Sequence, residues 1–333
     1  MTPMVRSDTR VYSPRQVRFI AGRLAQLVVV LICVSAFAFL MLNLLPGNPV
    51  YTLLGPAATP EAVAQLTAQL GLDKPVWQRY FVWLWNLLHG DLGSSYVNHQ
   101  AVLLSIQQRT PVTFELIFLS QMVALGLAIP LGIISAVRPN GVVDRLSSSV
   151  AFGLLSVPGF ILAEVLVYAL AVNFNLFPAT GYVHITEDPI ENLHSLTLPA
   201  LTLGLGSMAV YVRVLRTDMI ATLQQDYITL AIAKGLPTWY ILLRHAFRPS
   251  TFTLLTVAGL NIGTLIGGAF IIEYIFQVPG LGLLTINSIY GRDYLVVTAT
   301  SVFVAGGFVT INFLVDMLYV LLDPRIRSAR LAT

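Results

Sequence analysis

The sequence predicts an all-α membrane protein with six transmembrane helices, and its composition and hydropathy pattern support that fold class. Hydrophobic residues occupy 56% of the 333 positions and charged residues only 11%, which is roughly half of what soluble domains carry. Long apolar runs recur along the chain, and each approaches the roughly 20 residues that cross a bilayer core as a helix. These features together indicate a polytopic membrane protein.

Six apolar runs are long enough to span the membrane. The first is too long for the core of a signal peptide and lacks a small-residue cleavage site, so we interpret it as a true span. Its Cys33 is the single cysteine, which excludes an internal disulfide and a cysteine metal cluster. The expected spans are residues 24–45, 112–137, 146–172, 196–216, 251–273 and 295–322.

The distribution of basic residues predicts the orientation of these spans. Most of the 19 lysines and arginines lie at the two termini and in alternate loops, so we expect both termini to be cytoplasmic. The basic excess therefore reports topology and does not indicate a nucleic-acid partner. The basic residues on the outer side are Lys74, Arg79, Arg109 and Arg292.

We treat residues 1–333 as one transmembrane domain, because no linker or internal repeat divides them. Its long connections are an outer loop at 46–109, a cytoplasmic loop at 217–250 and an outer segment at 273–294. Within the first of these, Val76–Gly90 has apolar residues at helical spacing and three of the four tryptophans. That pattern predicts an amphipathic helix, which could rest on the membrane interface or serve as a docking surface.

The sequence gives no sign of an enzyme. It lacks the G-x-x-x-x-G-K-[ST], H-E-x-x-H and G-x-S-x-G patterns, and none of its five histidines is spaced as a paired metal ligand. Charges within the spans are sparse, so each is a candidate site. Glu164 follows a kink expected at Pro158; it could meet a cationic cargo, stay neutral, or pair with another chain.

The stretch DYITLAIAKGLP at 226–237 lies between two spans and predicts a short helix. Gly235 suits the end of that helix, and Pro237 suits the start of the next. A second short helix, WYILLRHAF, follows and is expected to end before Pro249. We call residues 226–247 the bracket; it could dock a soluble partner or lie flat on the membrane. Its expected apolar stripe comprises Leu223, Tyr227, Ile228, Leu230 and Ile232.

This stretch resembles the EAA loop of bacterial ATP-binding-cassette (ABC) importer permeases. It is most similar to the D-Y-[VI]-x-x-A-x-A-K-G-L form of the dipeptide, oligopeptide and nickel permease family. The order and spacing of further motifs extend the likeness over nearly the whole chain. These motifs are LLPGNPV (Leu44–Val50), LGLDKPVWQRY (70–80), HGDLGSSY (89–96), RTPVTFEL (Arg109–Leu116), IIEYIFQVPGLGLL (Ile271–Leu284), GRDY (Gly291–Tyr294) and VDMLYVLLDPRIR (Val315–Arg327).

The sequence departs from the family pattern at four positions. Asn48 stands where the family usually has Asp, which removes a charge from the outer mouth. Thr229 and Ile232 stand where basic residues are usual, so the bracket is less positive than in most members. Pro237 replaces the commoner serine and should fix the start of the second helix more firmly.

The resemblance implies a type I ABC importer permease fold with a cytoplasmic EAA coupling helix-turn-helix. The expected partners are a second homologous permease subunit, two ABC ATPase domains and an extracytoplasmic substrate-binding protein, assembled in the bacterial cell membrane. Cargo would cross by alternating access. The partner ATPases would bind ATP and Mg²⁺, so this chain would need no cofactor and would perform no catalysis.

The resemblance also implies two groups of functional residues. Gly235 is the strongest coupling candidate, because a side chain there is expected to obstruct the turn between the two helices. The ATPase-coupling residues are Asp226, Tyr227, Ala231, Lys234 and Gly235. The expected translocation-pathway or outer-gate residues are Glu273, Phe276, Pro279, Gly280, Gly282 and Glu164.

The cargo remains open between two classes at this point. Import of dipeptides or oligopeptides is the leading hypothesis, and import of nickel or another small solute by the same family is the alternative. A stand-alone secondary transporter is a more distant possibility, since such proteins favour paired charges near the midplane. The sequence does not specify peptide length, the arrangement of the ATPase chains or the contacts with the binding protein.

Overall fold

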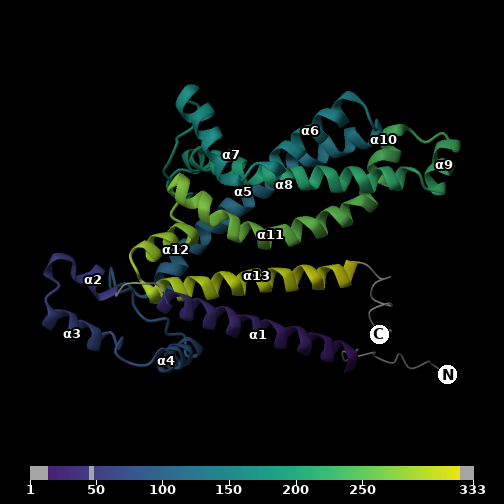
Figure 1. Cartoon of the computed structure of the whole chain (residues 1–333). Helices are drawn as coiled ribbons and strands as arrows, with labels where there is room; N and C mark the ends of the chain where they lie inside the picture. Colours follow the sequence, from purple (N-terminus) through teal and green to yellow (C-terminus); the bar gives the residue numbers. More distant parts are fainter. Residues whose placement is uncertain (1–13, 45–48, 323–333) are drawn as a thin grey trace, which may run out of the picture.

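The computed structural model describes residues 14–44 and 49–322, and these residues are almost entirely helical (Figure 1). Four described helical stretches are long and apolar enough to cross a membrane: Val102–Val137, Pro189–Leu223, Thr238–Phe276 and Tyr294–Val315. They correspond to α5 (Val102–Val137), α8 (Pro189–Leu223), α11 (Arg248–Phe276) with the turns before it, and α13 (Tyr294–Leu322). The chain is therefore an all-helical membrane protein.

The first helix, α1 (Pro14–Leu44), lies along α13 (Figure 1). Its apolar stretch Ala25–Met41 is shorter than the other four candidates. Many of its large apolar side chains are exposed, among them Val29 and Phe37. Such a surface is appropriate for a helix that faces lipid on one side and α13 on the other.

The region expected to form one kinked span at 146–172 is a sharply bent pair of helices. Helix α6 (Val142–Ser156) ends before Pro158, and α7 (Gly159–Leu166) continues into the π-helical η2 (Val167–Asn173). The two parts meet at 109°. Proline lacks a backbone N–H and disfavours a helical conformation at the preceding residue, and Val157 is extended. The kink expected at Pro158 is confirmed, and it is sharp enough to divide this region into two helices.

The segment before α5 forms a layer of short helices. These are α2 (Pro49–Leu54), the 3₁₀ turn η1 (Gly55–Ala57), α3 (Pro60–Gln69) and α4 (Val76–Leu88). The amphipathic helix predicted at 76–90 is thus confirmed as α4. Tyr80 and Trp83 pack on Phe39 of α1, with ring centroids 5.6 and 6.3 Å away, and they fix α4 against the bundle.

The bracket consists of α9 (Asp226–Ala233), α10 (Thr238–Tyr240) and the π-helical η3 (Ile241–Phe247). The second helix was expected to end before Pro249, but it continues into α11 as one helix from Thr238 to Phe276. Proline in a helix interior removes one hydrogen bond and crowds the preceding turn. The π-helical turn η3 lies just before Pro249. Wider turns of this kind often accompany a proline or another interruption of the helical hydrogen bonds.

The bundle has two distinct ends (Figure 1). The bracket, the start of α1 and the end of α13 lie at one end, which we call the bracket end. Helices α2–α4 and α12 (Leu281–Tyr290) lie at the other, the α12 end. Parts of two family motifs, residues 45–48 with Asn48 and residues 323–327, lie outside the described residues.

The core of the bundle lies among α5, α8 and α11, which pack closely. At Gly204 of α8, an added Cβ would lie 2.8 Å from the carbonyl oxygen of Ser120 on α5. Small residues at such crossings let helix backbones approach in a membrane, where apolar burial alone does not drive association. The tight α5–α8 contact therefore depends on the absence of a side chain at Gly204.

A buried polar cluster joins these three helices near the middle of their length. Tyr211 Oη donates to Gln121 Oε1 at 2.9 Å, and Asn261 Nδ2 lies 2.7 Å from Ser207 Oγ and 2.8 Å from Tyr211 Oη. Interhelical hydrogen bonds of this kind hold membrane helices together, typically by about 0.6 kcal/mol each. The cluster therefore fixes the relative register of α5, α8 and α11.

Candidate functional site

The bracket has a small apolar core of its own. Ile228 and Ala231 of α9 are buried against Ile241 of η3, with Leu223 and Leu236 packed around them. Tyr227 Oη also donates to the carbonyl of His245 at 3.3 Å. These contacts fix α9 to the long helix that contains α11, so the bracket is a packed unit and not a loose loop.

Gly235 ends α9 in a left-handed conformation, with φ +74°. The N–H of Leu236 donates to the carbonyl of Ala231, and that of Gly235 donates to the carbonyl of Ile232; this pair of bonds is a Schellman motif. No heavy atom lies within 4 Å of a Cβ added at Gly235. The expectation that a side chain would obstruct the turn is therefore wrong, and the constraint is the positive φ.

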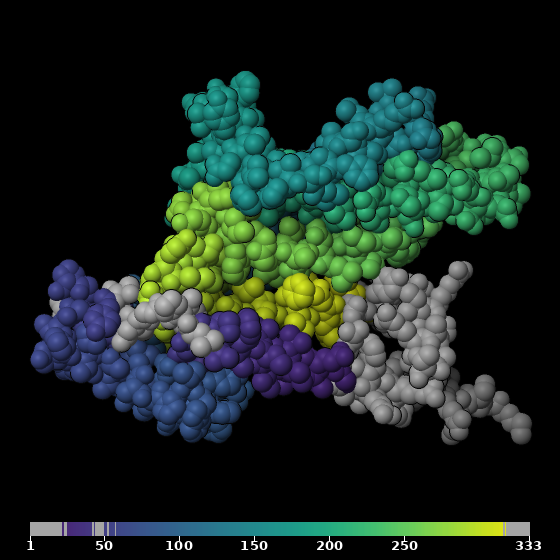
Figure 2. Space-filling model, viewed as in Figure 1, coloured from purple at the N-terminus to yellow at the C-terminus, as the bar shows by residue number. Residues whose placement is uncertain are grey.

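The outward face of the bracket is unusually apolar. Leu230, Ile232 and Trp239 are 56%, 62% and 64% exposed, and the bracket projects at one end of the space-filling surface (Figure 2). Of the residues expected to couple to an ATPase, four are exposed: Asp226, Tyr227, Lys234 and Gly235. The fifth, Ala231, is buried, so it supports the bracket from inside.

Two side chains at the bracket end were not recognised as important from the sequence. Trp239 stands out only as the one tryptophan outside the loop at 46–109. Asp144 of α6 forms a two-point ion pair with Arg216 of α8, through Nε and through Nη2, the latter at 2.8 Å. Asp144 also accepts the N–H of Asn140 at 2.7 Å. The pair ties the first arm of the bent pair to α8.

The α12 end contains a buried carboxylate on α11 that caps the N-terminus of the next helix, α12. Glu273, in the last turns of α11, is fully buried. Its Oε2 accepts the N–H groups of Gly282 and Leu283 at 2.6 and 3.2 Å. Thr113 of α5 donates to Oε1 at 2.6 Å and accepts the N–H of Leu281 at 2.9 Å. All three free N–H groups of the first turn of α12 therefore have acceptors.

We call Glu273, Thr113 and the first turn of α12 the outer hub. Gly280 and Gly282 are buried within it. A Cβ at Gly280 would collide with the Glu273 carboxylate, and one at Gly282 would collide with the backbone of Phe270. Both glycines are therefore required by close approach. Sequence reasoning missed Thr113, although it lies in the RTPVTFEL motif.

The remaining residues expected to line an outer gate lie in different surroundings. Phe276 is 1% exposed and belongs to the main apolar cluster, whereas Pro279 is half-buried beside the hub. Glu164, on α7, is exposed, and it forms no hydrogen bond or ion pair with any residue that the structure describes. The structure thus brings five of the six residues together at the start of α12 and leaves Glu164 apart.

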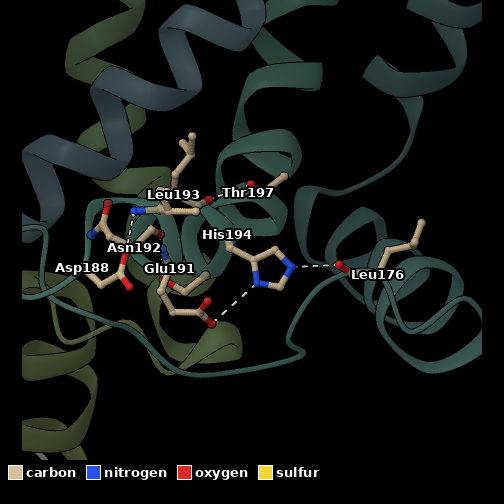
Figure 3. A network of polar contacts seen from close by, with 9 residues as sticks. Leu176, Asp188, Glu191, Asn192, Leu193, His194 and Thr197 are labelled. Carbon is tan, nitrogen blue, oxygen red and sulfur yellow. Dashed lines mark hydrogen bonds and ion pairs between the residues drawn. The ribbon is translucent and has the colours of Figure 1, made fainter.

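A polar network near the start of α8 accounts for one histidine (Figure 3). His194 Nε2 lies 2.8 Å from the carbonyl of Leu176, and Nδ1 lies 3.6 Å from Glu191. Asp188 caps the helix by accepting the N–H groups of Ile190 and Glu191 at 2.9 and 3.1 Å. His194 therefore ties the loop after η2 to α8. Among the described residues, no three His, Cys, Asp or Glu side chains are grouped as metal ligands.

Comparison with known protein families follows the same division of the chain. Residues 128–328 match the family described as "Binding-protein-dependent transport system inner membrane component". Residues 16–117 match the N-terminal domain of the membrane component of the same transport systems. The first match includes the bracket and the outer hub except for Thr113, which falls in the second match.

This chain belongs to the family of inner membrane components of binding-protein-dependent transport systems. It is therefore a multi-pass inner membrane protein and a non-catalytic permease subunit, in which no cofactor is expected. Its family implies a binding protein and ATPase subunits as partners. Membership excludes the stand-alone secondary transporter considered above.

Individual relatives match along nearly their whole length. A putative peptide transport system permease protein of Brucella abortus is 40% identical over 308 residues, which cover 92% of this chain and 98% of the relative. A probable peptide ABC transporter permease protein of Sinorhizobium fredii is 34% identical, covering 93% and 99%. The dipeptide transport system permease protein DppB of Escherichia coli is 34% identical, covering 94% and 99%.

Proposed function

We propose that this chain forms half of the translocation pathway of an ATP-driven importer that moves dipeptides or oligopeptides from a binding protein into the cytoplasm. The relatives described above are named as peptide or dipeptide permeases, and they match over more than 90% of this chain. Family membership supports the transport mechanism, and the names of the relatives support a peptide cargo over nickel.

The proposed topology has six spans within one domain of residues 1–333, with both termini in the cytoplasm. Helix α1, the bent pair at 142–173 and the four long apolar stretches supply the six crossings. The start of α1, the end of α13 and the bracket share one end of the bundle (Figure 1), as an even number of crossings requires. The basic residues around the bracket assign that end to the cytoplasm.

The observation that carries the coupling proposal is the apolar outward face of the bracket. At the water-facing end of a membrane protein, a cluster such as Leu230, Ile232 and Trp239 marks a surface that a soluble partner covers. Asp226, Tyr227, Lys234 and Gly235 rim this face and supply contacts to an ATPase domain. Ala231 contributes by packing, since it is buried.

The continuity of the helix from Thr238 to Phe276 suggests how coupling reaches the far side. A displacement of the bracket moves this helix as a lever, and its far end carries Glu273 and therefore α12. Closure of two ATPase domains around ATP, with Mg²⁺, would thus shift α12 relative to its neighbours. A second homologous permease would complete the pathway, which alternates between inward and outward access.

The outer-gate residues divide into two roles under this proposal. Glu273, Phe276, Pro279, Gly280 and Gly282 hold α12 in place, so that α12 moves as a rigid gate element. Glu164 is exposed on α7 without a described partner, so it is the member of the set available to a cationic group of the cargo. A carboxylate held near the bilayer interior without a partner is costly, which favours such a functional role.

The test is ATP-driven uptake of a radiolabelled dipeptide by proteoliposomes that contain this chain, its partner permease, the ATPases and the binding protein. We expect uptake that requires every subunit. Accumulation of nickel with no uptake of dipeptides or longer peptides would refute the cargo. Peptide uptake without the ATPases would refute the mechanism.

A further inference from the structure

A cavity of about 380 Å³ lies at the α12 end of the bundle, and none of the residues that define the outer hub lines it. It lies between the end of α1, helices α3 and α4, and the start of α13. Its rim includes the exposed side chains of Lys74 and Asp91, so it opens to the surface. Phe39, Arg79 and Trp83 form its inner wall.

Two hydrogen-bond donors in this wall are buried without an acceptor among the described residues. They are Nε of Arg79 and the indole Nε1 of Trp83, and Trp83 is only 5% exposed. A buried donor left unsatisfied costs about 1–3 kcal/mol. Because both residues line the same cavity, a ligand bound in it is the nearest source of an acceptor for these donors.

The guanidinium of Arg79 is already oriented for such a ligand. Its Nη2 donates to Asn43 Oδ1 on α1 at 2.5 Å, and its Cζ lies 6.0 Å from the ring centroid of Phe39. These contacts hold one edge of the guanidinium and leave Nε without a described acceptor. A fixed guanidinium with a free N–H suits a carboxylate or phosphate oxygen.

The charges around the cavity favour an anion. Lys74 and Arg79 are cationic, and Asp91 is the carboxylate among the described lining residues. Oδ1 of Asp91 already accepts the N–H of Gly93 at 2.8 Å. Burial, with the nearby charge of Asp293, raises the pKa of Tyr96 in the lining to about 12, so its hydroxyl remains a neutral donor at physiological pH. The balance is one net positive charge.

The surface beside the cavity identifies the source of the anion. On α4, Trp77, Phe81, Trp85 and Leu88 form one outward apolar face, and each is more than 60% exposed. Tryptophan-rich faces of this kind lie at the depth of lipid headgroups. The cavity on the neighbouring face of α4 is therefore at the level where phospholipid phosphates lie.

We propose that this cavity binds the phosphodiester of a phospholipid from the outer leaflet, with Arg79 Nε and Trp83 Nε1 as donors and Lys74 as the second cation. The assignment to the outer leaflet rests on the topology proposed above. The acyl chains would lie against the exposed apolar surfaces of α1 and α4. The bound lipid would anchor α4 to the bundle and satisfy the two donors of this wall that have no acceptor among the described residues.

The test uses the full chain in nanodiscs of phosphatidylethanolamine and phosphatidylglycerol. Native mass spectrometry then counts the phospholipids that remain bound after bulk lipid is stripped away. Arg79→Gln removes the charge and the Nε donor, and Trp83→Phe keeps an aromatic ring but lacks the N–H. Arg292→Gln is the matched control, because it removes a positive charge outside the cavity lining.

Most molecules of wild type and of Arg292→Gln should retain one bound phospholipid. The fraction of Arg79→Gln molecules that retain it should be about tenfold lower, because a charged hydrogen bond is lost. Trp83→Phe should lower the fraction by a smaller factor. Equal retention in all four proteins would overturn the proposal, even if dipeptide uptake remained normal. It would also be overturned if inorganic phosphate alone occupied the site and excluded lipid, or if Arg79→Gln weakened binding-protein affinity without altering lipid retention.

Discussion

The two ends of the bundle place apolar and polar side chains in opposite ways. At the bracket end, the apolar Leu230, Ile232 and Trp239 are exposed, whereas at the α12 end the carboxyl side chain of Glu273 is fully buried. The bracket satisfies its backbone internally through a Schellman turn, and its side chains remain available to another protein. The outer hub uses its polar side chains on its own backbone, and its surroundings are closely packed.

This contrast distinguishes an interface for a partner protein from an internal connection between two helices, which we call the joint. An exposed apolar face gains stability when a partner covers it, so changes there should affect assembly and coupling. A buried carboxylate that caps a helix gains nothing from a partner, so changes there should affect the folding of this chain. The following variants test that separation, from the largest expected effect to the smallest.

The largest effect is expected for Gly235→Asp. A side chain at φ +74° strains the turn, and the added carboxylate alters the face that we assign to the ATPase. ATP-driven uptake should fall at least about a hundredfold, as for loss of a central interface contact, while membrane insertion remains normal. Gly90→Asp is the control, since Gly90 also has a positive φ and open space around it but lies at the other end. Normal uptake by Gly235→Asp would remove the bracket from coupling.

The next effect is expected for Asp144→Asn, which removes the anion from the ion pair with Arg216. The Arg216 guanidinium left behind is 26% exposed, so the cost should lie below the roughly 3–5 kcal/mol of breaking a fully buried pair, but the midpoint of thermal unfolding in detergent should still drop. The double variant with Arg216→Met should recover much of the loss. Asp218→Asn, whose carboxylate has only a 3.4 Å contact with Thr253, should change little. A single variant as stable as wild type would show that the pair does not hold α6 to α8.

A smaller effect is expected for Gly282→Ala in the outer hub. The added methyl meets the backbone of Phe270, and overpacking of this kind costs about 1–3 kcal/mol. Hydrogen exchange should accelerate at the amides of residues 282 and 283 while ATPase binding stays intact. Gly267→Ala, with no atom within 4 Å of the added methyl, provides the control. Loss of ATPase binding without faster exchange would break the distinction between interface and joint.

The smallest effect on folding is expected for Glu164→Gln. Because Glu164 is exposed and has no described partner, the free energy of unfolding should change by no more than about 0.5 kcal/mol. Uptake of lysine-containing dipeptides should fall relative to neutral ones, and Glu164→Asp should restore it. Equal uptake of cationic and neutral dipeptides by wild type and Glu164→Gln would remove Glu164 from the pathway.

Much of the helical framework could be predicted from the sequence, because apolar runs near bilayer length can bury their backbone in few other ways. The amphipathic α4 was also predictable, since its apolar residues recur at helical spacing. The sharp bend at Pro158 was predictable in place but not in size, because a proline indicates a break and neighbouring helices determine its angle.

The part that Thr113 plays in the outer hub could not be predicted, because Thr113 is distant in sequence from Glu273 and α12. Glu273 meets Thr113 across 160 positions, and no local pattern reports that contact. A glutamate at the end of an apolar run resembles a pore-lining residue until its acceptor role toward α12 is known. The burial of Ala231 could not be predicted either, because a helix of eight residues such as α9 can place either face against its neighbour.

The claim that the bracket contacts an ATPase is tested most directly by cross-linking. In a Cys33→Ser background, Leu230→Cys should form a covalent product with an ATPase subunit in membranes that contain the assembled transporter. Phe81→Cys, equally exposed but on α4, should not form it. If Leu230→Cys gives no ATPase product while ATP-driven uptake is intact, the bracket is not the coupling surface.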